Sequence, residues 1–109
     1  MANTFKNYAA TGVGTSAATI LTGPGSTQTT VIGITVANIL TSGAITVDVY
    51  ATIGGTDYYI VKNAVIPVGG SLVPVGGDQK LVLEATDVLK VVSDTASSAD
   101  VIASVLEIT

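Results

Sequence analysis

Apolar and polar residues alternate along much of the chain with a period of two. In residues 44–53, the apolar positions predicted to share one face are Ile45, Val47, Val49, Ala51 and Ile53. The residues between them, predicted to face solvent, are Thr46, Asp48, Tyr50 and Thr52. This period is typical of a β-strand with one face on a core and one in water. No segment shows the spacing of an amphipathic helix.

Similar short segments predict the remaining strands. Residues 30–38 alternate with Ile32, Ile34 and Val36 on one side, and six further runs cover residues 17–22, 58–63, 71–75, 80–84, 87–93 and 101–108. Val, Ile and Thr supply more than a third of the 109 residues, and β-branched side chains favour strands over helices. The sequence therefore predicts an all-β fold, a single immunoglobulin-like or jelly-roll β-sandwich of seven to eight strands. Periodicity leaves the choice between these two topologies open.

Glycine and proline mark the predicted connections. Ser42-Gly43 and Gly54-Gly55 each separate two alternating runs and predict tight hairpins. The tetrapeptide at residues 67–70 (PVGG) recurs at residues 74–77. Because proline cannot donate a ladder hydrogen bond, these copies predict an edge strand, a bulge or a crossover between sheets.

The first 25 residues differ from the rest, which divides the chain into residues 1–25 and a sandwich domain at residues 26–109. The first segment carries only Lys6 as a charge and is rich in Ala, Thr, Gly and Ser. One interpretation is an arm that becomes ordered on a neighbouring subunit, with Phe5 and Tyr8 as anchors. The other is a first strand docked on its own sandwich, with Phe5 in the core.

Composition excludes several function classes. The chain has four Lys, eight Asp plus Glu, no Arg and no His, for a net charge of −4, and it has no Cys. These counts leave no imidazole base, no thiolate nucleophile and no basic surface for nucleic acid. No apolar run is long enough for a membrane span or a signal peptide, so we expect a chain made in the cytosol. The mean hydropathy of +0.64 suggests that part of the surface meets another protein.

Candidate chemical sites are weak. Glu84 and Asp87 straddle a turn, where carboxylates are usually solvated or bound to backbone N–H groups. Asp94 and Asp100 flank a polar loop and could share a Ca²⁺ ion, but their spacing matches no EF-hand. We therefore expect no enzyme activity, no catalytic or metal-binding residue, no cofactor and no small-molecule substrate.

Tyr58 and Tyr59, close in the predicted sheet to Tyr50, offer two interpretations. They could form a stacking platform for sugars or bases. Adjacent tyrosines in a strand more often divide between core and surface, and no basic groove accompanies these. A core or subunit-interface role is the preferred interpretation.

The segment from Tyr59 onward resembles a group of small virion structural proteins of tailed bacteriophages, and the opening MANTFKN resembles their N-termini. The matching positions are Asn63, Ile66, Pro67, Gly69, Ser71, Leu72, Gly77, Lys80, Leu83, Asp87, Lys90, Val91, Ser93, Asp100, Ser104 and Glu107. One departure is Thr86, where the pattern of these proteins prefers Gly, and it affects one turn. The resemblance implies an immunoglobulin-like sandwich that belongs to a virus particle.

This resemblance and the residues together favour a capsid decoration (cement) protein, which needs a rigid sandwich and an adhesive surface but no catalytic groups. Its expected partners are the major capsid protein and copies of itself in a homotrimer, and its expected location is the capsid surface of the virion, after synthesis in the bacterial cytoplasm. Alternatives are a tail, baseplate or fibre-attachment component, and a carbohydrate-binding module for the host surface. The candidate interface residues are Phe5, Lys6, Tyr8, Tyr58 and Tyr59.

Overall fold

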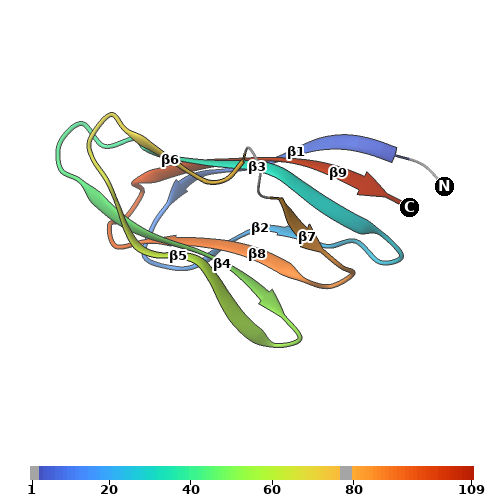
Figure 1. The fold of residues 1–109 in the computed structure, drawn as a ribbon. Helices are drawn as coiled ribbons and strands as arrows, with labels where there is room; N and C mark the ends of the chain where they lie inside the picture. The colour runs from blue at the N-terminus through green and yellow to red at the C-terminus, as the bar shows by residue number, and fades with distance from the viewer. Residues whose placement is uncertain (1–2, 77–79) are drawn as a thin grey trace.

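The computed structural model describes residues 3–76 and 80–109, and every regular element in them is a β-strand. The strands are β1 (Asn3–Val13), β2 (Ala18–Thr22), β3 (Gln28–Asn38), β4 (Ile45–Ile53), β5 (Thr56–Ile66), β6 (Ser71–Val75), β7 (Leu81–Leu83), β8 (Val88–Ser93) and β9 (Ala99–Ile108). They form two antiparallel sheets packed face to face (Figure 1). The predicted all-β sandwich is confirmed. Within the described residues no helix is long and apolar enough to cross a membrane.

The strand order identifies the sandwich as a jelly roll. The first sheet has the order β1-β9-β3-β6, with β7 also paired to β3, and the second sheet has the order β2-β8-β4-β5. The chain therefore changes sheet at each step from β1 to β4: β1 and β3 lie in the first sheet, and β2 and β4 lie in the second. An immunoglobulin fold keeps its first two strands in one sheet, whereas here β1 and β2 belong to different sheets. The structure thus decides between the two predicted topologies.

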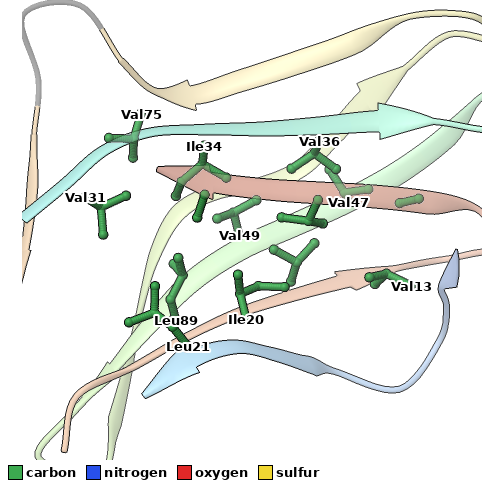
Figure 2. Close-up of a cluster of buried hydrophobic side chains, with 14 of the residues drawn as sticks. Val13, Ile20, Leu21, Val31, Ile34, Val36, Val47, Val49, Val75 and Leu89 are labelled. Carbon is green, nitrogen blue, oxygen red and sulfur yellow. The ribbon is translucent and has the colours of Figure 1, made fainter. Parts of the chain in front are cut away.

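The core lies between the sheets and consists almost entirely of aliphatic side chains (Figure 2). Val31, Ile34 and Val36 come from β3 in the first sheet, while Val49 and Leu89 come from the second. All five are 1% exposed or less. The inward positions of β4 from Ile45 to Ala51 and those of β9 follow the period of two that the sequence shows, because a strand between a core and solvent alternates its side chains. Ile53, predicted on the same face, is 37% exposed at the end of β4, next to the hairpin turn.

A bulge changes the predicted phase of β3. The register with β9 shifts between Val31 and Gly33, so the buried residues are Val31, Ile34 and Val36, and Ile32 is only partly buried. The expectation that Ile32 shares the core face with Ile34 is therefore wrong, because one extra residue in a strand reverses the faces on either side of it.

Two of the predicted connections differ in the structure. Gly54 and Gly55 form the turn of the β4–β5 hairpin, as expected, and both have positive φ. Ser42-Gly43 does not form a hairpin, because β3 and β4 lie in different sheets and this segment carries the chain across. Residues 67–70 likewise cross from β5 to β6 between the sheets, as one interpretation of the PVGG repeat predicted. Gly77 of the second copy lies outside the described residues.

The N-terminal segment forms the first strand of the sandwich in this structure. β1 pairs with β9 of the same chain, without interruption from Asn3 to Ala10. The expectation that a docked strand buries Phe5 is wrong. Phe5 lies opposite Leu106 on the outward face of the first sheet, and its side chain is 75% exposed.

Candidate interaction surface

The outward face of the first sheet carries a transverse row of uncharged residues. Phe5 lies opposite Leu106, which lies opposite Thr30, which lies opposite Val82. Directly opposed residues in a sheet share a face, so this row spans β1, β9, β3 and β7. Phe5 and Val82, at its two ends, are both exposed.

Two further rows continue this surface. Asn7 and Gly33 flank Ser104, whose hydroxyl donates a hydrogen bond to the Asn7 side chain. Ala9 and Thr35 flank Ile102, which is 54% exposed. We call these three rows together the uncharged face, since none of their residues is ionisable: Phe5, Leu106, Thr30, Val82, Asn7, Ser104, Gly33, Ala9, Ile102 and Thr35. Phe5, Val82 and Ile102 give this face exposed apolar side chains, and exposed apolar surface can mark a site of protein contact.

The outward face of the second sheet is different in character. Lys90 lies opposite Tyr50 there, with Asp48 two residues away on β4. On β5, Asp57 accepts a hydrogen bond from the Thr52 hydroxyl and Lys62 lies over the Tyr59 ring. The three rows of the uncharged face therefore carry no charge, and the first charged side chain beyond them on β9 is Asp100. The outward face of the second sheet instead carries charges of both signs.

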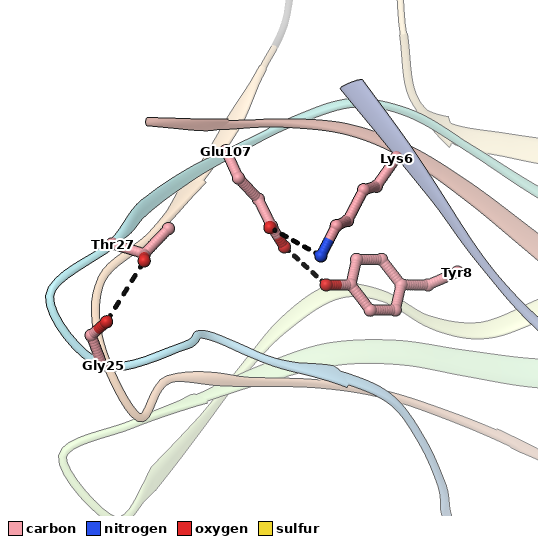
Figure 3. Close-up of polar contacts among 5 residues, drawn as sticks. All are labelled: Lys6, Tyr8, Gly25, Thr27 and Glu107. Carbon is pink, nitrogen blue, oxygen red and sulfur yellow. Dashed lines mark hydrogen bonds and ion pairs between the residues drawn. The ribbon is translucent and has the colours of Figure 1, made fainter. Parts of the chain in front are cut away.

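A buried carboxylate holds the N-terminal part of β1 in place (Figure 3). Glu107 of β9 is buried and points between the sheets. Its Oε1 lies 3.3 Å from the Lys6 Nζ, and its Oε2 accepts a 2.5 Å hydrogen bond from the Tyr8 hydroxyl. This hydrogen bond, together with burial and the nearby negative charge, raises the pKa of Tyr8 to about 12. The hydrogen bond to Glu107 therefore keeps Tyr8 protonated, and the Lys6 ammonium compensates the negative charge of the Glu107 carboxylate.

A second carboxylate holds the other end of β1. Asp100 Oδ1 accepts hydrogen bonds from the Thr11 hydroxyl at 2.6 Å and from the Gly12 backbone N–H at 3.1 Å. Gly12 has a φ of 64°, a conformation that glycine adopts without the strain a Cβ would add. β9 thus positions β1 through two acidic side chains near its ends.

The tyrosines do not form one platform. Tyr50 points outward from β4, as predicted, but neighbouring side chains bury it and it is not exposed to solvent. Its ring centroid lies 4.9 Å from that of Tyr59. The Lys62 Nζ lies 4.1 Å from the centroid of Tyr59. Tyr58 lies opposite Ala51, whose side chain faces the core, and so points away from Tyr59. Burial is the main cause that raises the pKa of Tyr50.

Three of the four carboxylates considered for chemistry, those of Asp87, Asp94 and Asp100, have structural roles. Asp87 Oδ2 accepts a hydrogen bond from the Glu84 N–H and closes the β7–β8 turn. Asp94 accepts one from the Thr46 N–H, which is the main cause that lowers the pKa of Asp94. Asp94 and Asp100 are therefore held by different strands. In the described part of the chain, no cluster of three or more His, Cys, Asp or Glu could hold a metal ion.

The structure does not gather the predicted interface residues on one surface. Phe5 lies at the β1 edge of the uncharged face, whereas Lys6 and Tyr8 point to the other side of β1, toward Glu107. Tyr58 and Tyr59 belong to β5 in the second sheet. Sequence reasoning missed Ile102 and Val82. The signal was present in β9, where the positions between buried residues from Val101 onward are Ile102, Ser104 and Leu106, with no charge among them.

Comparisons with known proteins support the fold only. No protein-family model and no curated protein matches the chain. A solved structure from work on Bacillus endospore appendages, described as a novel family of disulfide-linked pili, is similar with a TM-score of 0.53. The identity is 15%, over 99% of this chain and 87% of that one. At this identity the likeness shows a shared sandwich, and since this chain has no Cys, it cannot form disulfide links of the kind that the description gives for the other protein.

Proposed function

We propose that the protein is a capsid decoration protein of a tailed bacteriophage, which binds the outer capsid lattice and stabilises the particle without catalysis. The observation that carries this proposal is the difference between the two faces of the sandwich. The uncharged face suits burial against other subunits, because the centres of protein interfaces are depleted of charge. The charged face of the second sheet suits contact with solvent.

The resemblance to small virion proteins provides the identity of the partner in this proposal. The uncharged face would contact the major capsid protein, and the resemblance implies homotrimers at the capsid surface. A tail, baseplate or fibre-attachment component would use the same face in fewer copies. A carbohydrate-binding module receives less support, because Tyr50 is buried and Tyr58 and Tyr59 point to opposite sides of β5.

A pair of matched substitutions tests the proposed face. Ile102→Lys places a charge at the centre of the uncharged face, and Val65→Lys places one on β5 of the second sheet. Both residues are β-branched, apolar and exposed, at 54% and 66%. We expect Ile102→Lys to reduce incorporation into particles by at least about tenfold, since an unpaired charge in an interface costs several kcal/mol. Val65→Lys should be incorporated like the wild type.

The measurement is the amount of each variant in purified particles when it replaces the wild-type protein. Circular dichroism and thermal melting of the free variants establish that both are folded. Equal incorporation of the two variants would refute the uncharged face as the docking surface. Reduced incorporation of Val65→Lys alone would assign docking to the second sheet instead.

A further inference from the structure

β1 is an edge strand that lacks the features that normally prevent edge-to-edge pairing. It pairs with β9 on one side only, and its register is regular from Asn3 to Ala10. It has no proline, and its bulge lies beyond Ala10. Its single charge, Lys6, is paired with Glu107. Natural sheets usually protect such edges with charges, prolines, bulges or short strands.

The other outer strands in the described residues have these protections. β2 and β6 have five residues each, both with an irregular register, and β6 contains Pro74. β7 has three residues. β5 is as long as β1, but two register shifts interrupt its pairing with β4, and it carries Asp57 and Lys62. Asn63 of β5 also has a φ of 55°. Among the outer strands of the described residues, β1 is thus the long one whose free edge is available for pairing.

We propose that β1 pairs antiparallel with β1 of a second copy of this chain, across a two-fold axis that passes through Asn7. This inference concerns self-association. It proposes a two-fold dimer in place of the homotrimer that the resemblance implies, and it stands whether or not the protein binds a capsid. A two-fold axis perpendicular to the sheet places directly opposed residues on the same face, so only registers centred on a residue are allowed. Near the middle of the regular segment the choices are Lys6 and Asn7.

Charge decides between these two registers. An axis at Lys6 sets Lys6 against Lys6, which is unfavourable for like charges directly opposite. An axis at Asn7 sets Asn7 against Asn7, Phe5 against Ala9 of the second copy, and Lys6 against its Tyr8. No like charges then meet.

The apolar surface also favours a second copy as the occupant. Phe5 is the most exposed of the large apolar residues and lies at this edge. In the Asn7 register, Phe5 of each copy gains a neighbouring strand on its open side. The same symmetry keeps the uncharged faces of both copies on one side, so that the pair presents a single continuous uncharged surface.

Single cysteines provide a direct test, because the natural chain contains none. Directly opposed Cα atoms in an antiparallel pair lie about 4.5–5.5 Å apart, within the range that a disulfide spans. We expect Asn7→Cys to form a disulfide-linked dimer under mild oxidation. Ala9→Cys is the control, because two copies of residue 9 would be roughly four residues apart along the strands and should not be linked.

Sedimentation of the purified protein over a range of concentrations gives the second readout. We expect a species of twice the chain mass, and Asn7→Lys should weaken it by at least about tenfold by placing two ammonium groups on the axis. Val65→Lys, on the β5 edge, should leave the dimer intact. A protein that stays monomeric at about 100 μM, or a dimer insensitive to Asn7→Lys, would overturn the proposal. A homotrimer in which Asn7→Cys forms no disulfide-linked dimer would also overturn the proposal.

Discussion

At the scale of single residues, the turn between β7 and β8 contains a strained position. Thr86 has a φ of 71°, in the left-handed region that β-branched residues avoid. The resemblance to phage virion proteins singled out this position, since their pattern prefers Gly there. Glycine would be free of this strain, because it has no Cβ to oppose a positive φ.

Thr86→Gly should therefore stabilise the protein. We expect the free energy of unfolding to rise by about 1 kcal/mol, as the relief of left-handed strain exceeds the added entropy of the unfolded chain. Urea denaturation of the two proteins measures this difference. Ala85→Gly, in the same turn but at a residue without positive φ, should lower stability instead. A lower free energy of unfolding for Thr86→Gly than for the wild type would contradict the interpretation that Thr86 is strained.

The hydrogen bond from Tyr8 to Glu107 predicts a dependence of stability on alkaline pH. The pKa of Tyr8 in the folded protein, about 12, is above the unfolded value of about 10. Its contribution is therefore fully present below pH 10 and is lost as the pH rises toward 12. Tyr8→Phe should be less stable than the wild type at pH 8, and the difference should shrink between pH 10 and pH 12.

Chemical denaturation at a series of pH values measures this change. Tyr58→Phe removes an exposed hydroxyl and should keep the wild-type profile. A stability difference between Tyr8→Phe and the wild type that stays constant through pH 12 would contradict the proposed linkage.

At the scale of elements, Gly23 joins the end of β2 to the β7–β8 turn. Its N–H donates to the Asp87 carbonyl, and its own carbonyl accepts from the Thr86 N–H. A Cβ at this position would lie 2.3 Å from the Glu84 carbonyl oxygen. The close approach of these two backbones therefore requires a residue without a side chain.

Gly23→Ala should force these segments apart and lower the free energy of unfolding by about 1–3 kcal/mol. Gly25→Ala is the matched control, because a Cβ there meets no atom within 4 Å, and its effect should be within about 0.5 kcal/mol of zero. Thermal melting compares the variants. Similar melting temperatures for Gly23→Ala and the wild type would show that the contact is not tight.

The elements also show what the sequence can and cannot predict. The alternation in residues 44–53 locates β4 and its inward side chains from Ile45 to Ala51, because a strand between core and solvent has a period of two. The same rule misassigns Ile32, because a bulge depends on the partner strand rather than on local composition. The crossover at Ser42-Gly43 has the residues of a hairpin turn, and only the pairing of β3 with β9 and of β4 with β8 reveals it.

The candidate site was harder to predict than the strands. Phe5 was named as a candidate from its type and position, and the structure places it exposed at the edge of the uncharged face. Ile102 and Val82 join it only because β9 and β3 bring their residues into line across the sheet. The role of Glu107 depends on β1 lying beside β9, a pairing between the two ends of the chain.

At the scale of the whole molecule, the asymmetry of the sandwich is the basis of the functional account. A jelly roll with one uncharged face and one charged face can bind to a surface on one side and remain hydrated on the other. Pairing through β1 would double the area of the uncharged face without adding charge to it. These features support the proposed role in a repeating assembly, and the central claim of that proposal is that the protein is present in many copies on one particle.

Copy number per particle tests this claim most directly. Quantitative mass spectrometry of purified virions, with the major capsid protein as the internal reference, gives the ratio of the two chains. The account predicts about one copy for each capsid subunit, or for every few of them. A count of a few dozen or fewer per particle, or absence from the particle, would contradict it.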